Sequence, residues 1–88
     1  MIVYIEALEL ENSASALSEL AKYQEEIKEF EDAVLNDDHE NVIEEFYDVI
    51  QTMTQTLLLL GVDIDKLKEG QYVHRDKLKG RGWKMKEI

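Results

Sequence analysis

Apolar residues recur along the first half of the chain with the spacing of a helix. From residue 16 to residue 34 they stand alternately four and three positions apart, as in a narrow stripe packed against another helix: Ala16, Leu20, Tyr23, Ile27, Phe30 and Val34. Asn12, Ser13 and Ser15 favour a helix N-cap, so we predict that the helix starts in this segment, or continues from the preceding one, and ends near Leu35. Residues 2–11 fit neither a helix period nor a strand period cleanly, and only a short helix is predicted there.

A second helix is predicted from Glu40 to about Leu60, after a turn of Asn, Asp and His at residues 36–39. Because the turn is short, the two helices are expected to form an antiparallel hairpin. Two adjacent apolar stripes together cover roughly half of the second helix; they hold Val42, Phe46, Val49, Met53, Leu57 and Leu60, and Ile43, Tyr47, Ile50, Thr54 and Leu58. One partner helix cannot cover so wide an arc, so we predict a homodimer or homotetramer.

A third helix is predicted to begin at Ile64, with Asp63 as its N-cap. Gly70 weakens that helix, so we expect two shorter pieces on either side of it, the second running through Leu78. Gly80 is expected to end the helix and to begin an irregular tail.

The composition is that of a small protein with one domain. Residues 1–88 are 44% hydrophobic and contain no proline and no low-complexity linker that would mark a boundary. The predicted fold class is therefore all-α, a helical hairpin with a shorter C-terminal helix that oligomerisation completes into a bundle. The absence of cysteine excludes disulfides, zinc–thiolate sites and thiol nucleophiles. Neither a signal peptide nor a membrane-spanning run is recognisable, so we expect a cytoplasmic protein without a membrane partner.

Charge is distributed unevenly along the sequence. The net charge is −10, and residues 1–65 hold 17 of the 20 Asp and Glu residues but only 2 of the 10 Lys and Arg residues. An acidic body attracts divalent cations and a basic tail suits phosphate, although a basic tail is equally consistent with simple neutralisation of an acidic bundle. Nucleic acid is not an expected partner, because a negatively charged surface repels it.

Two pairs of carboxylates lie near the predicted seam of the hairpin. Glu26 and Glu29 stand three apart on the first helix, and Glu45 and Asp48 stand three apart on the second. On a helical wheel Glu26 and Glu45 adjoin the apolar stripes, whereas the other two lie further round and are equally consistent with a solvated surface. Converging carboxylates repel one another unless a cation compensates, and hard oxygen ligands suit Mg²⁺ or Mn²⁺.

These acidic residues also match a known pattern. Glu-Glu-x-x-Glu at 25–29 and Glu-x-x-Asp at 45–48 resemble the signature of the MazG-like family in the all-alpha nucleoside triphosphate pyrophosphohydrolase superfamily. The resemblance covers roughly residues 17–83, and its closing segment, His74 to Trp83, is similar to that of small MazG-like proteins also carried by phages. It implies an enzyme that uses Mg²⁺ to split a nucleoside triphosphate into the monophosphate and pyrophosphate.

By position, the resemblance implies four metal ligands: Glu26, Glu29, Glu45 and Asp48. Glu25 or Glu44, each of which precedes a ligand, is a candidate for orienting or deprotonating the attacking water, and either is equally consistent with an exposed charge. Lys77 and Arg81 match basic positions at the end of family sequences and are candidates for holding the pyrophosphate.

Two alternatives stay open from the sequence. Phosphoribosyl-ATP pyrophosphohydrolases of the same superfamily are similarly short and also carry paired acidic motifs. A non-catalytic acidic helical interaction protein would suit the net charge, but it would need neither the paired carboxylates nor a basic tail. No glycine-rich loop precedes a predicted helix, so P-loop and Rossmann nucleotide sites are excluded.

Overall fold

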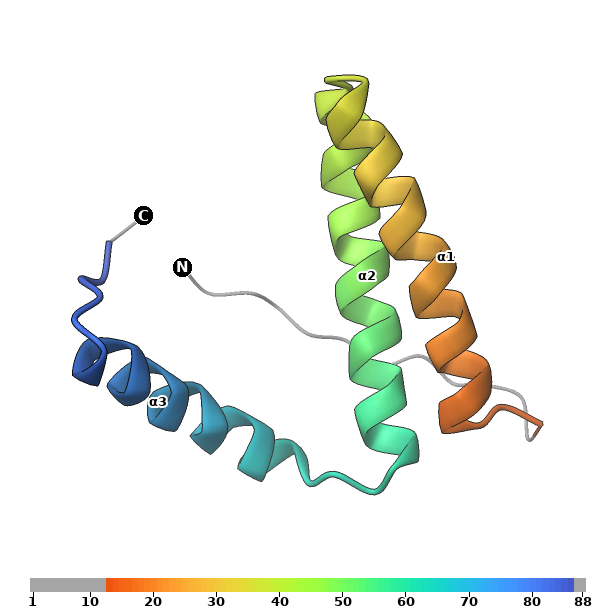
Figure 1. The fold of residues 1–88 in the computed structure, drawn as a ribbon. Coiled ribbons are helices and arrows are strands. Elements are labelled where there is room, and N and C mark those ends of the chain that lie inside the picture. The colour runs from red at the N-terminus through yellow and green to blue at the C-terminus, as the bar shows by residue number, and fades with distance from the viewer. Residues whose placement is uncertain (1–12, 87–88) are drawn as a thin grey trace. The chain divides into compact units, whose positions relative to one another are not determined.

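The computed structural model describes residues 13–86, which form three helices and no strand: α1 (Ala16–Leu35), α2 (His39–Leu59) and α3 (Ile64–Gly80) (Figure 1). The predicted all-α fold with a third helix is confirmed. The chain divides into two compact units, the α1–α2 hairpin up to Gly61 and the segment from Val62 onward. The short helix predicted at residues 2–11 lies outside the described residues.

The N-terminus of α1 is fixed by two serines. The Ser15 hydroxyl accepts a hydrogen bond from the backbone N–H of Ser18 at 3.1 Å, and the Ser18 hydroxyl accepts one from the N–H of Ser15 at 2.9 Å. This reciprocal arrangement, a capping box, satisfies two N–H groups that the first helical turn leaves unpaired. The helix therefore begins at Ala16 and does not continue from the residues just before it.

The turn between α1 and α2 combines a helix end with a helix start. Asp37 takes up the left-handed conformation (φ 53°), which lets its N–H donate to the carbonyl of Val34 and the N–H of Asp38 donate to the carbonyl of Ala33. The Asp38 carboxylate then accepts from the N–H of Asn41 at 3.3 Å and caps α2. One tight turn thus sets α1 and α2 side by side as the predicted antiparallel hairpin (Figure 1).

The prediction that Gly70 divides the third helix was wrong, because α3 is continuous from Ile64 to Gly80. A single glycine costs a helix only about 1 kcal/mol relative to alanine. Asp63 offsets that cost by capping the N-terminus through the N–H of Asp65 at 2.8 Å. Lysines at 77 and 79 add favourable charge at the C-terminus. The end at Gly80 and the irregular residues after it agree with the prediction.

Replacing Gly70 by Ala is expected to raise the free energy of unfolding by about 0.5–1 kcal/mol. Gly70 has ordinary helical backbone, and an added Cβ would meet no atom within 4 Å. Gly82, by contrast, has a φ of 89°, where a side chain is strained, so Gly82→Ala is a matched control that should destabilise the chain. Thermal denaturation measures both variants, and a lower stability of Gly70→Ala would show that another surface packs against this position.

The hairpin leaves most of its apolar side chains uncovered. Among residues 13–86 only one apolar residue, Ala33, is buried, whereas Tyr47 is 57% exposed and Ile43 is 61% exposed. The other buried residues are polar: Glu19, Glu45, Thr54 and Gln55. The wide apolar arc predicted on α2 is therefore not covered within the α1–α2 hairpin itself. None of these helices is long and apolar enough to span a bilayer.

We expect the protein to be an oligomer in which a second copy covers this apolar surface, because so small a buried core cannot offset the conformational entropy of the ordered residues. Ile43→Glu should then dissociate the assembly and lower the melting temperature, whereas Asn41→Glu, at an exposed polar position on the same helix, should do neither. Light scattering combined with melting at several protein concentrations measures both effects. A stable monomer whose melting is independent of concentration would contradict this expectation.

Candidate metal centre and adjoining groove

A ladder of polar residues runs along the seam between α1 and α2. In an antiparallel hairpin, residues equally far from the turn at Asp37 stand at the same height. On this basis four pairs form what we call the polar seam: Glu29 and Glu45, Glu26 and Asp48, Lys22 and Thr52, and Glu19 and Gln55. Helical spacing that usually places apolar residues along such a seam here places charged, hydroxyl and amide side chains, of which Glu19, Glu45 and Gln55 are buried.

Three carboxylates converge at the end of the seam nearer the turn. One oxygen from each of Glu26, Glu29 and Glu45 lies within 4.8 Å of the others. Glu45 is buried, with 8% of its surface exposed, whereas Glu26 is half-buried and Glu29 is exposed. The cluster is thus buried on the side of α2, at Glu45, and open to solvent at Glu29.

The two inner carboxylates lack hydrogen-bond donors when both are ionised. The Oε2 atoms of Glu26 and Glu45 are buried and have no partner. A proton shared with Glu26 and burial together raise the pKa of Glu45 to about 7. The pKa of Glu26 is also raised, mainly by burial. A hydrogen bond with Glu45 acts to lower this pKa, but the negative charges of Glu29 and Asp48 raise it further. A proton or a cation is needed to stabilise this cluster.

A hard divalent cation fits this donor set. The cluster supplies carboxylate oxygens only, and Mg²⁺ and Mn²⁺ prefer such ligands. The unpartnered buried oxygens of Glu26 and Glu45 are the groups that such a cation would satisfy. Asp48 is half-buried beside them, and its charge acts on Glu26, but it stands outside the group of three.

A groove of about 280 Å³ adjoins the cluster along the polar seam. It is lined from α1 by Glu19, Lys22, Glu25 and Glu26, and from α2 by Asp48, Gln51, Thr52 and Gln55. Of the two candidates for activating water, Glu25 is exposed at this groove, whereas Glu44 is exposed and does not line it. Thr52 also lines the groove, and its hydroxyl donates to the carbonyls of Asp48 and Val49, which leaves the hydroxyl oxygen only acceptor capacity.

Sequence reasoning missed Glu19 and Gln55 as members of the site. The signal was present, because the spacing of the acidic motifs continues for two more turns: 19, 22, 26 and 29 on α1 and 45, 48, 52 and 55 on α2. Lys22 is also part of this continuation, and its Nζ lies 3.6 Å from Oε1 of Glu19.

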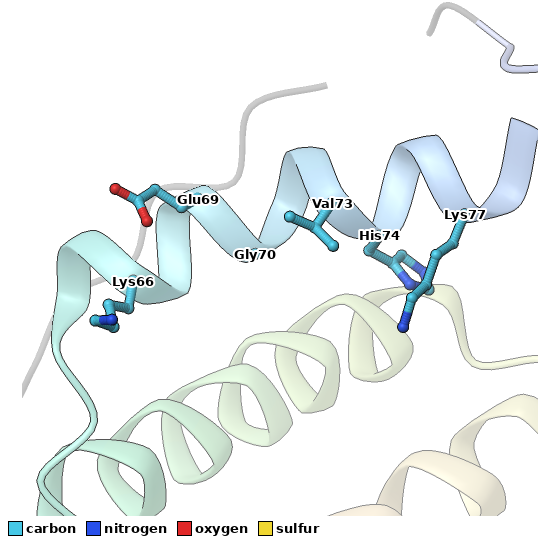
Figure 2. Close-up of a pocket in the computed structure, with 6 residues that line it drawn as sticks. All are labelled: Lys66, Glu69, Gly70, Val73, His74 and Lys77. Atoms are coloured by element: carbon cyan, nitrogen blue, oxygen red, sulfur yellow. The ribbon is translucent and has the colours of Figure 1, made fainter.

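The two basic candidates belong to the other unit of the chain. Lys77 lies on α3, where it lines a shallow hollow of about 330 Å³ together with Lys66, Gly70 and His74. Figure 2 shows that Lys66, His74 and Lys77 project to one side of the helix. Arg81 is the C-cap of α3, where its own backbone N–H bonds the last carbonyls, and it does not line the hollow. Their role toward phosphate stays a prediction.

The comparisons with known proteins identify one family. The sequence profile described as phosphoribosyl-ATP pyrophosphohydrolase matches residues 6–75, which include both acidic motifs and the whole polar seam. Lys77 and Arg81 lie beyond the matched range. No curated protein and no solved structure matches the chain significantly.

Proposed function

The chain belongs to the phosphoribosyl-ATP pyrophosphohydrolase family, and from this premise we propose that it hydrolyses nucleoside triphosphates between the α and β phosphates. Members of the family are hydrolases of phosphoric anhydride bonds, and the chain is such an enzyme. In the proposed reaction one water molecule is consumed and the bridging P–O bond breaks. The products are a nucleoside monophosphate and pyrophosphate.

The observation that carries the proposal is the convergence of Glu26, Glu29 and Glu45 around buried oxygens that lack a donor. These carboxylates, with Asp48 beside them, would hold Mg²⁺, or Mn²⁺ in its place. A bound divalent cation neutralises phosphate charge and lowers the pKa of bound water, which is the chemistry that phosphoanhydride hydrolysis requires. An acidic interaction surface would not need buried carboxylates that face one another.

The remaining chemistry falls to residues around the cluster. We assign Glu25, and not Glu44, as the candidate that orients or deprotonates the attacking water, since only Glu25 lines the groove. No protein nucleophile is needed, because water attacks phosphorus directly. Lys77 and Arg81 remain the candidates for binding the departing pyrophosphate, a role that suits cationic side chains.

Within the superfamily we propose the MazG-like branch, with ordinary ribo- or deoxyribonucleoside triphosphates as substrates. The support is the acidic motif at 25–29 and 45–48 together with the closing segment His74–Trp83, most of which lies beyond the matched family range. Phosphoribosyl-ATP is the second candidate substrate, and the family match itself favours it. Both substrates would be cleaved at the same bond.

Incubating the protein and Mg²⁺ with a panel of nucleoside triphosphates and with phosphoribosyl-ATP tests the proposal, provided that pyrophosphate and orthophosphate are measured separately. We expect pyrophosphate and the matching monophosphate, and no release when EDTA replaces Mg²⁺. Cleavage of phosphoribosyl-ATP, without cleavage of any nucleoside triphosphate, would show that phosphoribosyl-ATP is the substrate. Orthophosphate as the first product would contradict α–β cleavage for both.

A further inference from the structure

Beyond the carboxylate cluster, the polar seam ends in two deeply buried polar side chains. Glu19 on α1 is 3% exposed and Gln55 on α2 is 4% exposed, and both line the groove that reaches Glu26 and Asp48. Burying a carboxylate costs free energy unless hydrogen-bond donors surround it, and an apolar pair of similar volume would serve the packing at least as well. The burial of Glu19 at a groove therefore calls for a role other than packing.

The ion pair of Glu19 uses only part of its capacity to accept hydrogen bonds. Lys22 lies 3.6 Å from Oε1 of Glu19, and the Lys22 side chain itself is largely exposed. An ionised carboxylate offers two oxygens with about four lone-pair sites. Glu19 can therefore also accept from a donor group that enters the groove.

The distance along the hairpin indicates which part of a nucleotide would reach Glu19. Glu19 stands seven residues before Glu26 on α1, which is two helical turns or roughly 10 Å. Gln55 stands seven residues after Asp48 on α2, so Glu19 and Gln55 lie at the same height along the hairpin. With the phosphates at the carboxylate cluster, the ribose comes next along the groove and the base lies farthest from the metal.

On the basis of the proposed function, we propose that Glu19 selects the base of the substrate by accepting a hydrogen bond from its exocyclic amino group, with the amide of Gln55 beside it. A carboxylate accepts from an amino group and repels a carbonyl oxygen at the same place. The groove would thus favour a base that carries an amino group, adenine or cytosine, over its oxo counterpart, hypoxanthine or uracil.

The test compares matched nucleotide pairs that differ at this group. The affinities of non-hydrolysable α,β-methylene analogues of CTP and UTP, and of ATP and ITP, are measured calorimetrically with Mg²⁺, so the result does not depend on turnover. We expect the wild type to favour the amino member of at least one pair by roughly tenfold or more. Glu19→Gln, whose amide N–H₂ can donate to a carbonyl oxygen, should remove that preference. Glu31→Gln, the same change at an exposed position of α1, should keep it.

Equal affinities of the wild type for both members of each pair would overturn the inference. So would a preference that Glu19→Gln leaves intact, since Glu19 would then serve only to hold Lys22. A weakening of all four analogues by the same factor in Glu19→Gln would also overturn it, by showing a general loss of groove structure. Failure of the proposed function is distinguishable, because it shows as an absence of pyrophosphate release by the wild-type protein.

Discussion

Glu45→Gln is expected to lower pyrophosphohydrolase activity by roughly a hundredfold or more while leaving the helices intact. Replacing a residue that only hydrogen-bonds a metal ligand typically lowers metal affinity or activity about 10–100-fold. Replacing a direct ligand should lower activity at least as much. The amide keeps the size of the side chain but removes the charge that binds the cation. It also relieves repulsion with Glu26, so the metal-free variant should melt no lower than the wild type. Steady-state rates and circular dichroism give both quantities.

Replacing Glu26 and Glu29 by Gln and Asp48 by Asn extends the test to the whole predicted ligand set. Glu31→Gln and Glu40→Gln carry the same loss of charge at exposed positions outside the polar seam and should retain near-normal rates. Full activity in all four ligand variants would remove the metal-site hypothesis. Equal losses in the ligand and control variants would show that overall negative charge matters and that these positions have no special role.

The metal-free protein is expected to lose stability as the pH rises from about 5 to about 8. The pKa of Glu45 is about 7 in the folded chain against an ordinary value of 4.5, so folding favours its protonated form. Its stabilising contribution is complete below the unfolded pKa and disappears as the pH passes the folded pKa. Since a cation binds the ionised carboxylates, Mg²⁺ should stabilise the protein most at the upper end of this range.

Melting temperatures in EDTA and in Mg²⁺, at fixed protein concentration and ionic strength, measure this dependence. Glu45→Gln cannot titrate at this position, so its metal-free melting temperature should fall less between the same pH values. NaCl at matched ionic strength should not reproduce the effect of Mg²⁺, because screening acts on all exposed charges alike. A metal-free wild type whose stability stays constant or rises over this range would refute the shared proton, because ordinary paired carboxylates change the stability only below about pH 5.

The helices were predictable because their ends carry local signals. Asp38 and Asp63 each cap a helix by accepting a hydrogen bond from a backbone N–H two or three residues later. Such interactions depend only on neighbouring residues and need no tertiary context. Gly70 misled the prediction because a helix propensity of about 1 kcal/mol is small beside the combined preference of sixteen other helical residues. Propensity at one position predicts a weak point and not a break.

The candidate site was predictable only in part. The motif spacing placed Glu26 and Glu45 near the seam, but a helical wheel cannot show how far the two helices rotate toward each other, and so it set Glu29 too far round. Glu19 and Gln55 continue the spacing of the acidic motifs, but spacing alone does not reveal their burial, which only the paired helices create. The sequence predicts an apolar stripe at the centre of the seam, whereas in the structure most of the buried residues of the hairpin are polar and much of its apolar surface is exposed within the hairpin.

Direct measurement of Mn²⁺ binding tests most sharply whether the carboxylates of the polar seam form a metal centre. Isothermal titration calorimetry at about pH 8, above the raised pKa of Glu45, should show saturable binding to the wild type and to Glu31→Gln. Glu45→Gln should bind at least tenfold more weakly. Equal, weak and non-saturating binding by all three proteins would contradict the account, because it would reduce the cluster of Glu26, Glu29 and Glu45 to diffuse negative charge.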